Sequence, residues 1–201
     1  MSVEIEIEPM KHLDKYRIIL GSQSPRRKEL LEGLDLRFEQ RAIPDLDECY
    51  PRSLPTREIA EYLARHKAAA YAPTLAPDEL LITADTIVLL EEDVLGKPQD
   101  EEEARAMLTR LAGRSHEVVT GVCVSTVKQM ASLSSCTRVY FEPIPSHAID
   151  YYVSTYHPLD KAGSYGIQEW IGYRFISRIE GCYYNVMGLP VQQLAGLLTA
   201  F

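Results

Sequence analysis

The 201-residue chain lacks long hydrophobic runs: no apolar stretch approaches the roughly 18 residues that a membrane-spanning helix needs. It also lacks a secretory pattern, because residues 1–10 alternate apolar and acidic side chains instead of placing a basic segment before an apolar one. Basic residues are in the minority, and the formal net charge is −8. Since sequence-independent nucleic-acid binding relies on excess basic surface, these absences predict a cytoplasmic protein with no membrane and no nucleic-acid partner.

Cysteine is scarce, and its four positions, Cys49, Cys123, Cys136 and Cys182, show no CxxC pair or other regular spacing. Zinc sites and small disulfide frameworks have tighter patterns, so we expect reduced thiols. Familiar catalytic motifs are absent as well: there is no GxxxxGK[ST] loop, no GxSxG elbow and no HxxxH pair. The five histidines are therefore given no role.

Helices and strands are predicted to alternate along the chain, which is 46% hydrophobic and can bury a sizeable core. Strands are predicted over 17–20, 37–42, 80–90, 94–95, 116–126, 137–143 and 174–180, with a hairpin tip near 128–135. Helices are predicted over 25–33, 56–71, 101–111, 146–155 and 190–200, with Ser24 and Thr56 as caps of the first two. The class is α/β with a mixed sheet. Residues 1–16 form a leader, for which an edge strand, an ordered arm and a mobile tail are alternatives.

One acidic residue interrupts the longest apolar stretch. The segment Ile82–Val88 reads ITADTIV and places Asp85 between two hydroxyl residues of a strand that should be covered on both faces. An ionisable group there is costly unless it is paired, bound to a metal or used chemically. Asp85 is therefore the candidate for activating water.

A basic turn follows the first strand. Ser22 adds a hydroxyl donor, and Arg26 and Arg27 lie in the first turn of the predicted helix, where positive charge opposes the helix dipole. Free backbone N–H groups at a helix N-terminus suit an anion, and guanidinium groups match phosphate oxygens. Arginines solvated on a helix face are the alternative.

Three lysines and a glutamine complete the candidate set. Lys67 lies on the helix face that should be packed, where a phosphate ligand and a snorkelling lysine are alternatives. Lys97 sits in a Gly-Lys-Pro loop. Lys161 and Gln168 flank a glycine-bearing loop, and a buried glutamine could read the carbonyl and N–H edge of a base.

Together these residues predict an enzyme with a polyphosphate site. Hydrolysis of a phosphoanhydride needs in-line attack, neutralised phosphate oxygens and a prepared nucleophile, so Asp85 would act as general base or metal ligand. The acidic loop 45–48 is the obvious source of a second carboxylate, although acidic loops are more often solvated.

Seven ordered motifs resemble the Maf family of nucleotide pyrophosphatases from about Ile18 onward: GSQSPRRKELL, ARHKA, ITADTIV, LGKP, GRSHEVVTGV, DKAGSYGIQ and NVMGLP. The resemblance implies a single catalytic domain over 17–201, with an elongated mixed sheet, flanking helices and two lobes around a cleft, as in inosine-triphosphate pyrophosphatases. It also implies hydrolysis of nucleoside triphosphates to monophosphate and pyrophosphate with a divalent metal cation, Mg²⁺ or Mn²⁺.

The resemblance carries roles onto matching positions. Asp85 would be the general base and a metal ligand, and Glu48 resembles the family's acidic metal-side residue. The phosphate pocket would contain Ser22, Arg27, Lys67 and Lys97. The markers of the branch acting on dTTP and UTP would be Arg26, Thr86 and Gln168, where the 7-methyl-GTP branch carries SPWR, SDQ and a loop without that glutamine.

Alternatives to a dTTP and UTP pyrophosphatase remain open. The same reaction on 7-methyl-GTP or another purine nucleotide is one, and a non-catalytic, nucleotide-binding regulator of septum formation is another. The intact Asp85 speaks against the regulator. The expected partner is a small-molecule nucleotide, including modified pyrimidine nucleotides, and a homodimer is left open.

Overall fold

The structure is a computed structural model that describes residues 10–42 and 49–201. The described residues form one sheet of seven strands in the order β2-β1-β3-β5-β6-β7, with β4 paired to β3 off this path. The strands are β1 (Arg17–Leu20), β2 (Phe38–Gln40), β3 (Glu79–Leu90), β4 (Asp93–Leu95), β5 (Ser115–Ser125), β6 (Met130–Phe141) and β7 (Ile176–Glu180). β1 runs parallel to β2 and β3, and the other pairs are antiparallel. The predicted α/β class with a mixed sheet is confirmed.

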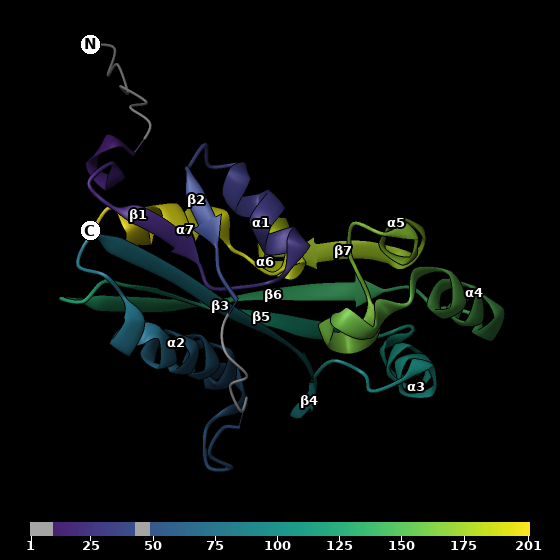
Figure 1. Ribbon diagram of the computed structural model, residues 1–201. Helices are drawn as coiled ribbons and strands as arrows, with labels where there is room; N and C mark the ends of the chain where they lie inside the picture. Colours follow the sequence, from purple (N-terminus) through teal and green to yellow (C-terminus); the bar gives the residue numbers. More distant parts are fainter. Residues whose placement is uncertain (1–9, 43–48) are drawn as a thin grey trace, which may run out of the picture.

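Helices cover both faces of the sheet and gather at its two ends (Figure 1). On one face lies α2 (Ile59–Tyr71), and on the other lie α1 (Pro25–Glu32), α6 (Tyr183–Met187) and α7 (Val191–Leu198). The far end carries α3 (Glu101–Leu111), α4 (Ser146–Tyr156) and α5 (Trp170–Phe175). Short 3₁₀ turns are η1 (Lys11–Leu13), η2 (Thr56–Glu58), η3 (Ala72–Thr74), η4 (Pro158–Asp160) and η5 (Ala162–Ser164). The long β5–β6 ribbon joins the two groups of helices and gives the molecule its elongated shape.

Strand β3 carries core side chains on both faces because successive residues point to opposite sides of a sheet. Leu80 and Ile82 belong to the larger hydrophobic cluster, which also contains residues of α1 and α7. Leu81 and Leu89 pack in two smaller clusters with residues of α2. The whole strand is buried except for Thr86, which is partly exposed. This is the central strand that the continuous apolar run predicted.

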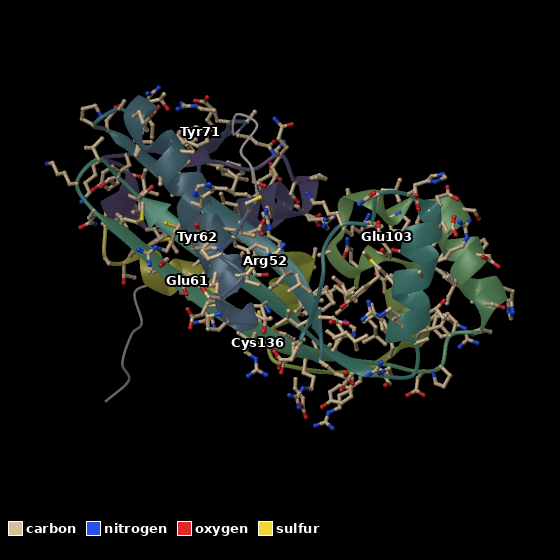
Figure 2. The ribbon with its side chains drawn as sticks, turned by 90° about the horizontal axis from the view of Figure 1, so that it is seen from below. Arg52, Glu61, Tyr62, Tyr71, Glu103 and Cys136 are labelled. Carbon is tan, nitrogen blue, oxygen red and sulfur yellow. The ribbon has the colours of Figure 1, made fainter. Side chains whose placement is uncertain are left out.

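Helix α2 approaches the sheet closely at Gly121 of β5. A Cβ added to Gly121 would lie 2.3 Å from backbone atoms of Ala60, so no side chain fits between helix and strand. Figure 2, seen from the α2 side, shows the helix lying across the sheet, with Tyr62 and Glu61 along it and α3, carrying Glu103, at the far end. The contact at Ala60 places the later turns of α2 over β3.

One edge of β3 is left open in its middle. β1 pairs with β3 only as far as Ile82, and β4 pairs with it only from Val88. Between those positions, no strand of the described residues pairs with this edge. Asp85 and Thr86 lie in this gap and, as neighbours along a strand, project toward opposite faces of the sheet.

Some sequence-based expectations were wrong. The hairpin tip lies at 126–129 because β6 begins at Met130 and pairs with β5 from there to Tyr140. Helices α5 and α6 were not predicted, since segments of 6 and 5 residues are too short to show helical periodicity. Thr56 does not cap α2: the segment opens with the 3₁₀ turn η2, and the Thr56 hydroxyl donates to Glu92.

The described part of the leader packs against the C-terminus. Leu13 is buried, His12 Nε2 lies 3.1 Å from Leu198 O, and the Tyr16 hydroxyl donates to Phe201 O over 3.3 Å. Residues 10–16 thus form an ordered arm, and residues 1–9 lie outside the described residues.

Two sequence-based expectations concern the cysteines and the helices of the described residues. Cys123, Cys136 and Cys182 are free thiols. None of the helices formed by the described residues has the length and apolar character that crossing a membrane requires.

Candidate functional site

A cavity of about 360 Å³ opens at the gap beside β3, between α1 and α2 on one side and the loop 160–168 on the other. Every candidate residue within the described part of the chain lines it: Ser22, Arg26, Arg27, Lys67, Asp85, Thr86, Lys97, Lys161 and Gln168. Glu48, the remaining candidate, lies outside the described residues. The fold therefore gathers positions that are up to 146 residues apart (Ser22 and Gln168), while their roles stay predictions.

Asp85 and Lys67 form a buried ion pair on the α2 side of the sheet. Lys67 Nζ lies 2.6 Å from Asp85 Oδ1, and only 8% of Lys67 and 9% of Asp85 is exposed. The gap in β3 supplies the carboxylate, and the close approach of α2 supplies the ammonium. A snorkelling lysine would instead carry its charge out to bulk water, so that alternative does not describe Lys67.

The turn after β1 fixes the start of α1. Gly21 N donates to Ile82 O over 2.8 Å, which holds the turn against β3. Ser24 is the N-cap, as predicted, and its hydroxyl accepts from Arg27 N over 3.4 Å. Ser22 Oγ accepts from Ser24 N over 3.3 Å, so both serine hydroxyls stabilise the turn from which the arginines project.

The Arg27 guanidinium is held in one orientation by three hydrogen bonds. Nε donates to Gly188 O over 2.9 Å, Nη2 to Thr86 Oγ1 over 3.0 Å and Nη1 to Ser22 Oγ over 3.4 Å. Gly188 has a φ of +113°, a conformation that favours glycine, where the chain leaves α6. Arg27 is thus fixed by groups from the ends of β1 and α6 and from the middle of β3.

Lys97 is the exposed cation of the site. Its loop is tied to the loop 160–168, because Gly163 N donates to Gly96 O over 3.0 Å. Gly163 has a φ of +67°, and a Cβ there would lie 2.9 Å from Val88 Cγ2, so the loop lies directly on β3. Within 10–42 and 49–201, no hydrogen bond or ion pair holds the Lys97 ammonium, which leaves it available to a ligand.

Asp160, which is not among the residues predicted from the sequence, joins two of the predicted cations. Arg26 Nη1 lies 2.7 Å from its Oδ2, and Lys161 Nζ lies 2.7 Å from its Oδ1. Partial burial raises the pKa of Asp160, but the hydrogen bonds from Lys161 and Arg26 outweigh it and hold that pKa below its ordinary value. Lys161 also pairs with Glu169 over 3.1 Å, and Glu169 accepts from the Tyr152 hydroxyl. The acidic neighbour of Lys161 in the DKAG motif was the available signal.

The cavity also has an apolar wall, made by Val88, Val118, Ala162, Tyr165, Val186 and Met187. The Tyr165 hydroxyl lies 2.7 Å from His116 Nε2, and burial lowers the pKa of His116 to about 3, so its imidazole is neutral. Gln168 lines the same cavity, and its Oε1 is buried without a hydrogen bond from any described residue. Such an acceptor carries a free-energy cost that a donor on a ligand would remove.

Asp85 is the described carboxylate on which a metal site would depend. Among the described residues, no group of three or more His, Cys, Asp or Glu side chains is arranged to hold a metal ion. Mg²⁺, however, is commonly held by one or two carboxylates together with substrate phosphates. A hard carboxylate in a cavity lined with cations fits that mode of binding.

Two further buried polar residues lie behind the cavity. Thr120 and Asn185 have no exposed surface, and neither was singled out from the sequence. Both fall inside quoted motifs, GRSHEVVTGV and NVMGLP, which was the only signal available. Their contacts depend on pairing across the sheet, and spacing along one chain does not reveal that pairing.

Comparison with known proteins identifies relatives over nearly the whole chain. Residues 17–201 match the family described as "Maf-like protein". The dTTP/UTP pyrophosphatase of Phocaeicola vulgatus is 54% identical over 185 residues, which cover 92% of this chain and 96% of the relative. That of Porphyromonas gingivalis is 55% identical over 194 residues, 96% of this chain and 98% of the relative. Among solved structures, a HAM1 protein from Coxiella burnetii covers 92% of this chain and 100% of its own, with 18% identity and a TM-score of 0.48, too distant a likeness to support an argument.

Proposed function

We propose, from the premise that this chain belongs to the family of Maf-like proteins, that it hydrolyses dTTP and UTP to the nucleoside monophosphate and pyrophosphate. The two relatives named above are dTTP/UTP pyrophosphatases, and each aligns with more than nine-tenths of this chain. Modified pyrimidine nucleotides fit the same reaction, which would give the enzyme a house-cleaning role.

The observation that carries the proposal is that one cavity is lined both by cationic side chains and by apolar side chains. Arg27, Lys67 and Lys97 bring positive charge to the lining, as a triphosphate requires. The apolar wall that includes Tyr165 suits a nucleobase, and the unpaired oxygen of Gln168 calls for a donor on that base.

Uracil and thymine supply such a donor, because each presents an N–H group between two carbonyl oxygens. The Gln168 amide can accept from this N–H and donate to a neighbouring carbonyl. Cytosine has no hydrogen on the corresponding ring nitrogen, so the Gln168 amide would have to turn over, donating to that nitrogen and accepting from the exocyclic amino group. Arg26 and Thr86 are the other residues that we assign to base selection.

Asp85 is the residue that we assign to water activation. The Lys67 ammonium engages Oδ1, so Oδ2 is the oxygen that we assign to the proton of the attacking water. Asp85 and Glu48 would hold a divalent cation, Mg²⁺ or Mn²⁺, together with substrate oxygens, and the cation would supply neutralisation of phosphate charge and a lower pKa of bound water.

The remaining candidates bind and orient the triphosphate. Ser22 approaches it from the turn before α1, Arg27 from the first turn of α1, and Lys97 and Lys161 from the loops on the far side of the cavity. Holding the phosphates on both sides fixes the phosphorus for in-line attack, which is where most of the rate enhancement in phosphoryl transfer arises.

The experiment is pyrophosphate release from a panel of triphosphates with Mg²⁺ or Mn²⁺, for the wild type, Asp85→Asn and Asp93→Asn. Asp93 is a matched control, because its exposed carboxylate pairs with Arg110 on the surface. We expect UTP and dTTP to be hydrolysed fastest, Asp85→Asn to be inactive and Asp93→Asn to match the wild type. No hydrolysis of any triphosphate by the wild type would refute the enzyme, and 7-methyl-GTP or another purine above UTP would refute the pyrimidine assignment.

We further propose that residues 17–201 act as one catalytic domain preceded by the leader, in the cytoplasm, on free nucleotides rather than nucleic acid. The support is the net charge of −8 and a cavity of about 360 Å³, a size that suits a small molecule. A homodimer remains a prediction, which light scattering of the purified protein tests.

A further inference from the structure

A chain of hydrogen bonds leads from the cavity into the core. Arg27 Nη2 lies 3.0 Å from Thr86 Oγ1, which lies 3.0 Å from Thr120 Oγ1, which lies 3.0 Å from Asn185 O. Thr86 and Thr120 are register partners on β3 and β5, so their side chains stand side by side on the same face of the sheet. Thr120 is fully buried and is not part of the cavity lining.

The two ends of this chain fix the direction of every bond in it. A guanidinium can only donate, so Thr86 accepts from Arg27, and a carbonyl can only accept, so Thr120 donates to Asn185 O. Thr120 has one hydroxyl hydrogen, which that bond uses. The hydrogen between the two threonines therefore belongs to Thr86. One arrangement satisfies all three contacts.

This direction limits what Thr86 can offer a ligand. Its only hydrogen points at Thr120, and one of its two lone pairs is engaged by Arg27. Thr86 therefore faces the cavity solely as a hydrogen-bond acceptor. The group that it matches on a nucleotide is a donor, either the ring N–H of the base, which Thr86 would then share with Gln168 Oε1, or a hydroxyl of the sugar.

The segment after β7 holds the inner end of this chain of hydrogen bonds in place. The Asn185 side chain donates to Val118 O over 3.0 Å and to Thr137 Oγ1 over 2.9 Å, which fixes α6 against β5 and β6. The same segment supplies Gly188 O, the other close acceptor of Arg27. Arg27 is thus held twice by the segment 185–188, once directly through Gly188 O and once through the two threonines and Asn185 O.

We propose that Thr120 is a positioning residue for substrate selection, which acts through Thr86. It takes the hydroxyl hydrogen of Thr86, so that Thr86 remains an acceptor toward the ligand and toward Arg27. The proposal rests on the proposed function and adds a residue outside the cavity to it. Without the Thr120 hydroxyl, the Thr86 hydrogen is free to turn toward the ligand. A base with an acceptor at that point, such as cytosine at its ring nitrogen, is then no longer disfavoured.

The test compares Thr120→Val, which keeps the shape and removes the hydroxyl, with Thr120→Ser, which keeps the hydroxyl. Thr83→Val is the matched control, because Thr83 is equally buried on β3 and its hydroxyl donates to Ala64 O on the other side of the sheet, outside the cavity lining. For each variant, kcat and KM are measured with UTP and CTP, and with dTTP and its 3′-deoxy analogue. Binding of non-hydrolysable analogues of the same nucleotides is measured by calorimetry.

We expect Thr120→Val to lower the preference for UTP over CTP about fivefold, the size of one net hydrogen bond, mainly through KM. If the matching donor is a sugar hydroxyl, the same loss appears instead between dTTP and its 3′-deoxy analogue. Thr120→Ser should restore the wild-type preference, and Thr83→Val should keep it. In a Thr86→Val background, Thr120→Val should cause no further loss, because the residue through which it acts is gone.

A Thr120→Val protein that is folded and keeps both preferences would overturn the proposal, as would equal losses in Thr83→Val or full additivity with Thr86→Val. The proposed function fails separately, if the wild type hydrolyses no triphosphate. The binding measurements then still decide the role of Thr120. Should Thr120→Val not fold, the same nucleotide preferences are compared between Thr120→Ser and Thr120→Cys. A thiol is a much weaker donor than a hydroxyl, so the preference should be lower in Thr120→Cys, and equal preferences would overturn the proposal.

Discussion

Replacing Lys67 by methionine should destabilise the protein because it leaves Asp85 without its cation. At an effective dielectric constant of about 20, unit charges 2.6 Å apart attract each other by about 6 kcal/mol before desolvation is counted. Breaking a buried pair by removing one partner costs about 3–5 kcal/mol net. The side chains here are 11% and 12% exposed at a cavity that water can enter, so we expect the lower end, about 3 kcal/mol.

The assay is urea unfolding at pH 7, together with the thermal midpoint. For a chain of 201 residues, a loss of about 3 kcal/mol lowers the midpoint by roughly 6–12 °C. Lys28→Met is the matched control, because Lys28 is half-exposed and pairs with Glu32 on the surface of α1 over 3.7 Å. Removing that surface pair should change stability by less than about 0.5 kcal/mol.

A second substitution separates the ion pair from other effects of losing the lysine. If the cost comes from a buried, unpaired carboxylate, adding Asp85→Asn to Lys67→Met should recover about 1–2 kcal/mol, since a neutral amide is cheaper to bury than a lone charge. The reasoning is refuted if Lys67→Met is as stable as Lys28→Met. It is also refuted if the double variant is less stable than Lys67→Met alone.

Two further changes test the packing around the site. The pKa of His116 lies near 3 in the folded protein and near 6.5 when unfolded, so its contribution to stability is complete above pH 6.5 and lost as the pH falls toward 3. His116→Gln, which can still form a hydrogen bond with the Tyr165 hydroxyl, should reduce the loss of unfolding free energy with falling pH by up to about 1.4 kcal/mol per pH unit. The free energy of unfolding is measured in urea at pH 7, 6 and 5, and an equal pH dependence in the wild type and His116→Gln would contradict the prediction. Gly121→Ala should cost about 3 kcal/mol, because its Cβ would meet the backbone of Ala60 at 2.3 Å. A Cβ at Gly196 would have no other atom within 4 Å, so Gly196→Ala should instead stabilise α7 by about 0.5–1 kcal/mol. Equal urea midpoints for Gly121→Ala and Gly196→Ala would contradict the close contact between Gly121 and Ala60.

The candidate site could be read from the sequence largely because phosphate chemistry uses recognisable residues in short motifs. Asp85 stood out because a charge inside an apolar run is costly, and Arg27 because a cation in the first turn of a helix needs a reason. Both observations are local. They identified residues that line the cavity without any knowledge of how far apart the motifs lie in space.

The residues that escaped prediction act across strands or between loops. Asp160 is ordinary in the sequence, and only the fold shows that it joins Arg26 to Lys161. Thr120 is one threonine among many until the register of β3 and β5 places it opposite Thr86. Register is set by the packing of the whole sheet, so a local pattern does not contain it.

The helices and strands show the same contrast between local signals and long-range pairing. The strand Arg17–Leu20 and the helix Glu101–Leu111 were predicted to the residue, because apolar periodicity and capping signals mark their ends. The start of β6 was missed because its first half is rich in serine and gains its strand conformation from pairing with β5 rather than from intrinsic preference.

By itself the sequence determined which residues carry charge, which segments can form a core, and that a carboxylate and several cations must find partners. Only the tertiary structure decided that β1 stops at Ile82 and β4 starts at Val88, which opens the edge of β3 where Asp85 and Thr86 lie. It also decided that α2 comes close enough at Gly121 to bring Lys67 to Asp85. The physical reason is that side-chain chemistry is a property of single residues, whereas cavities, ion pairs and the direction of hydrogen bonds depend on distances between segments that only packing sets.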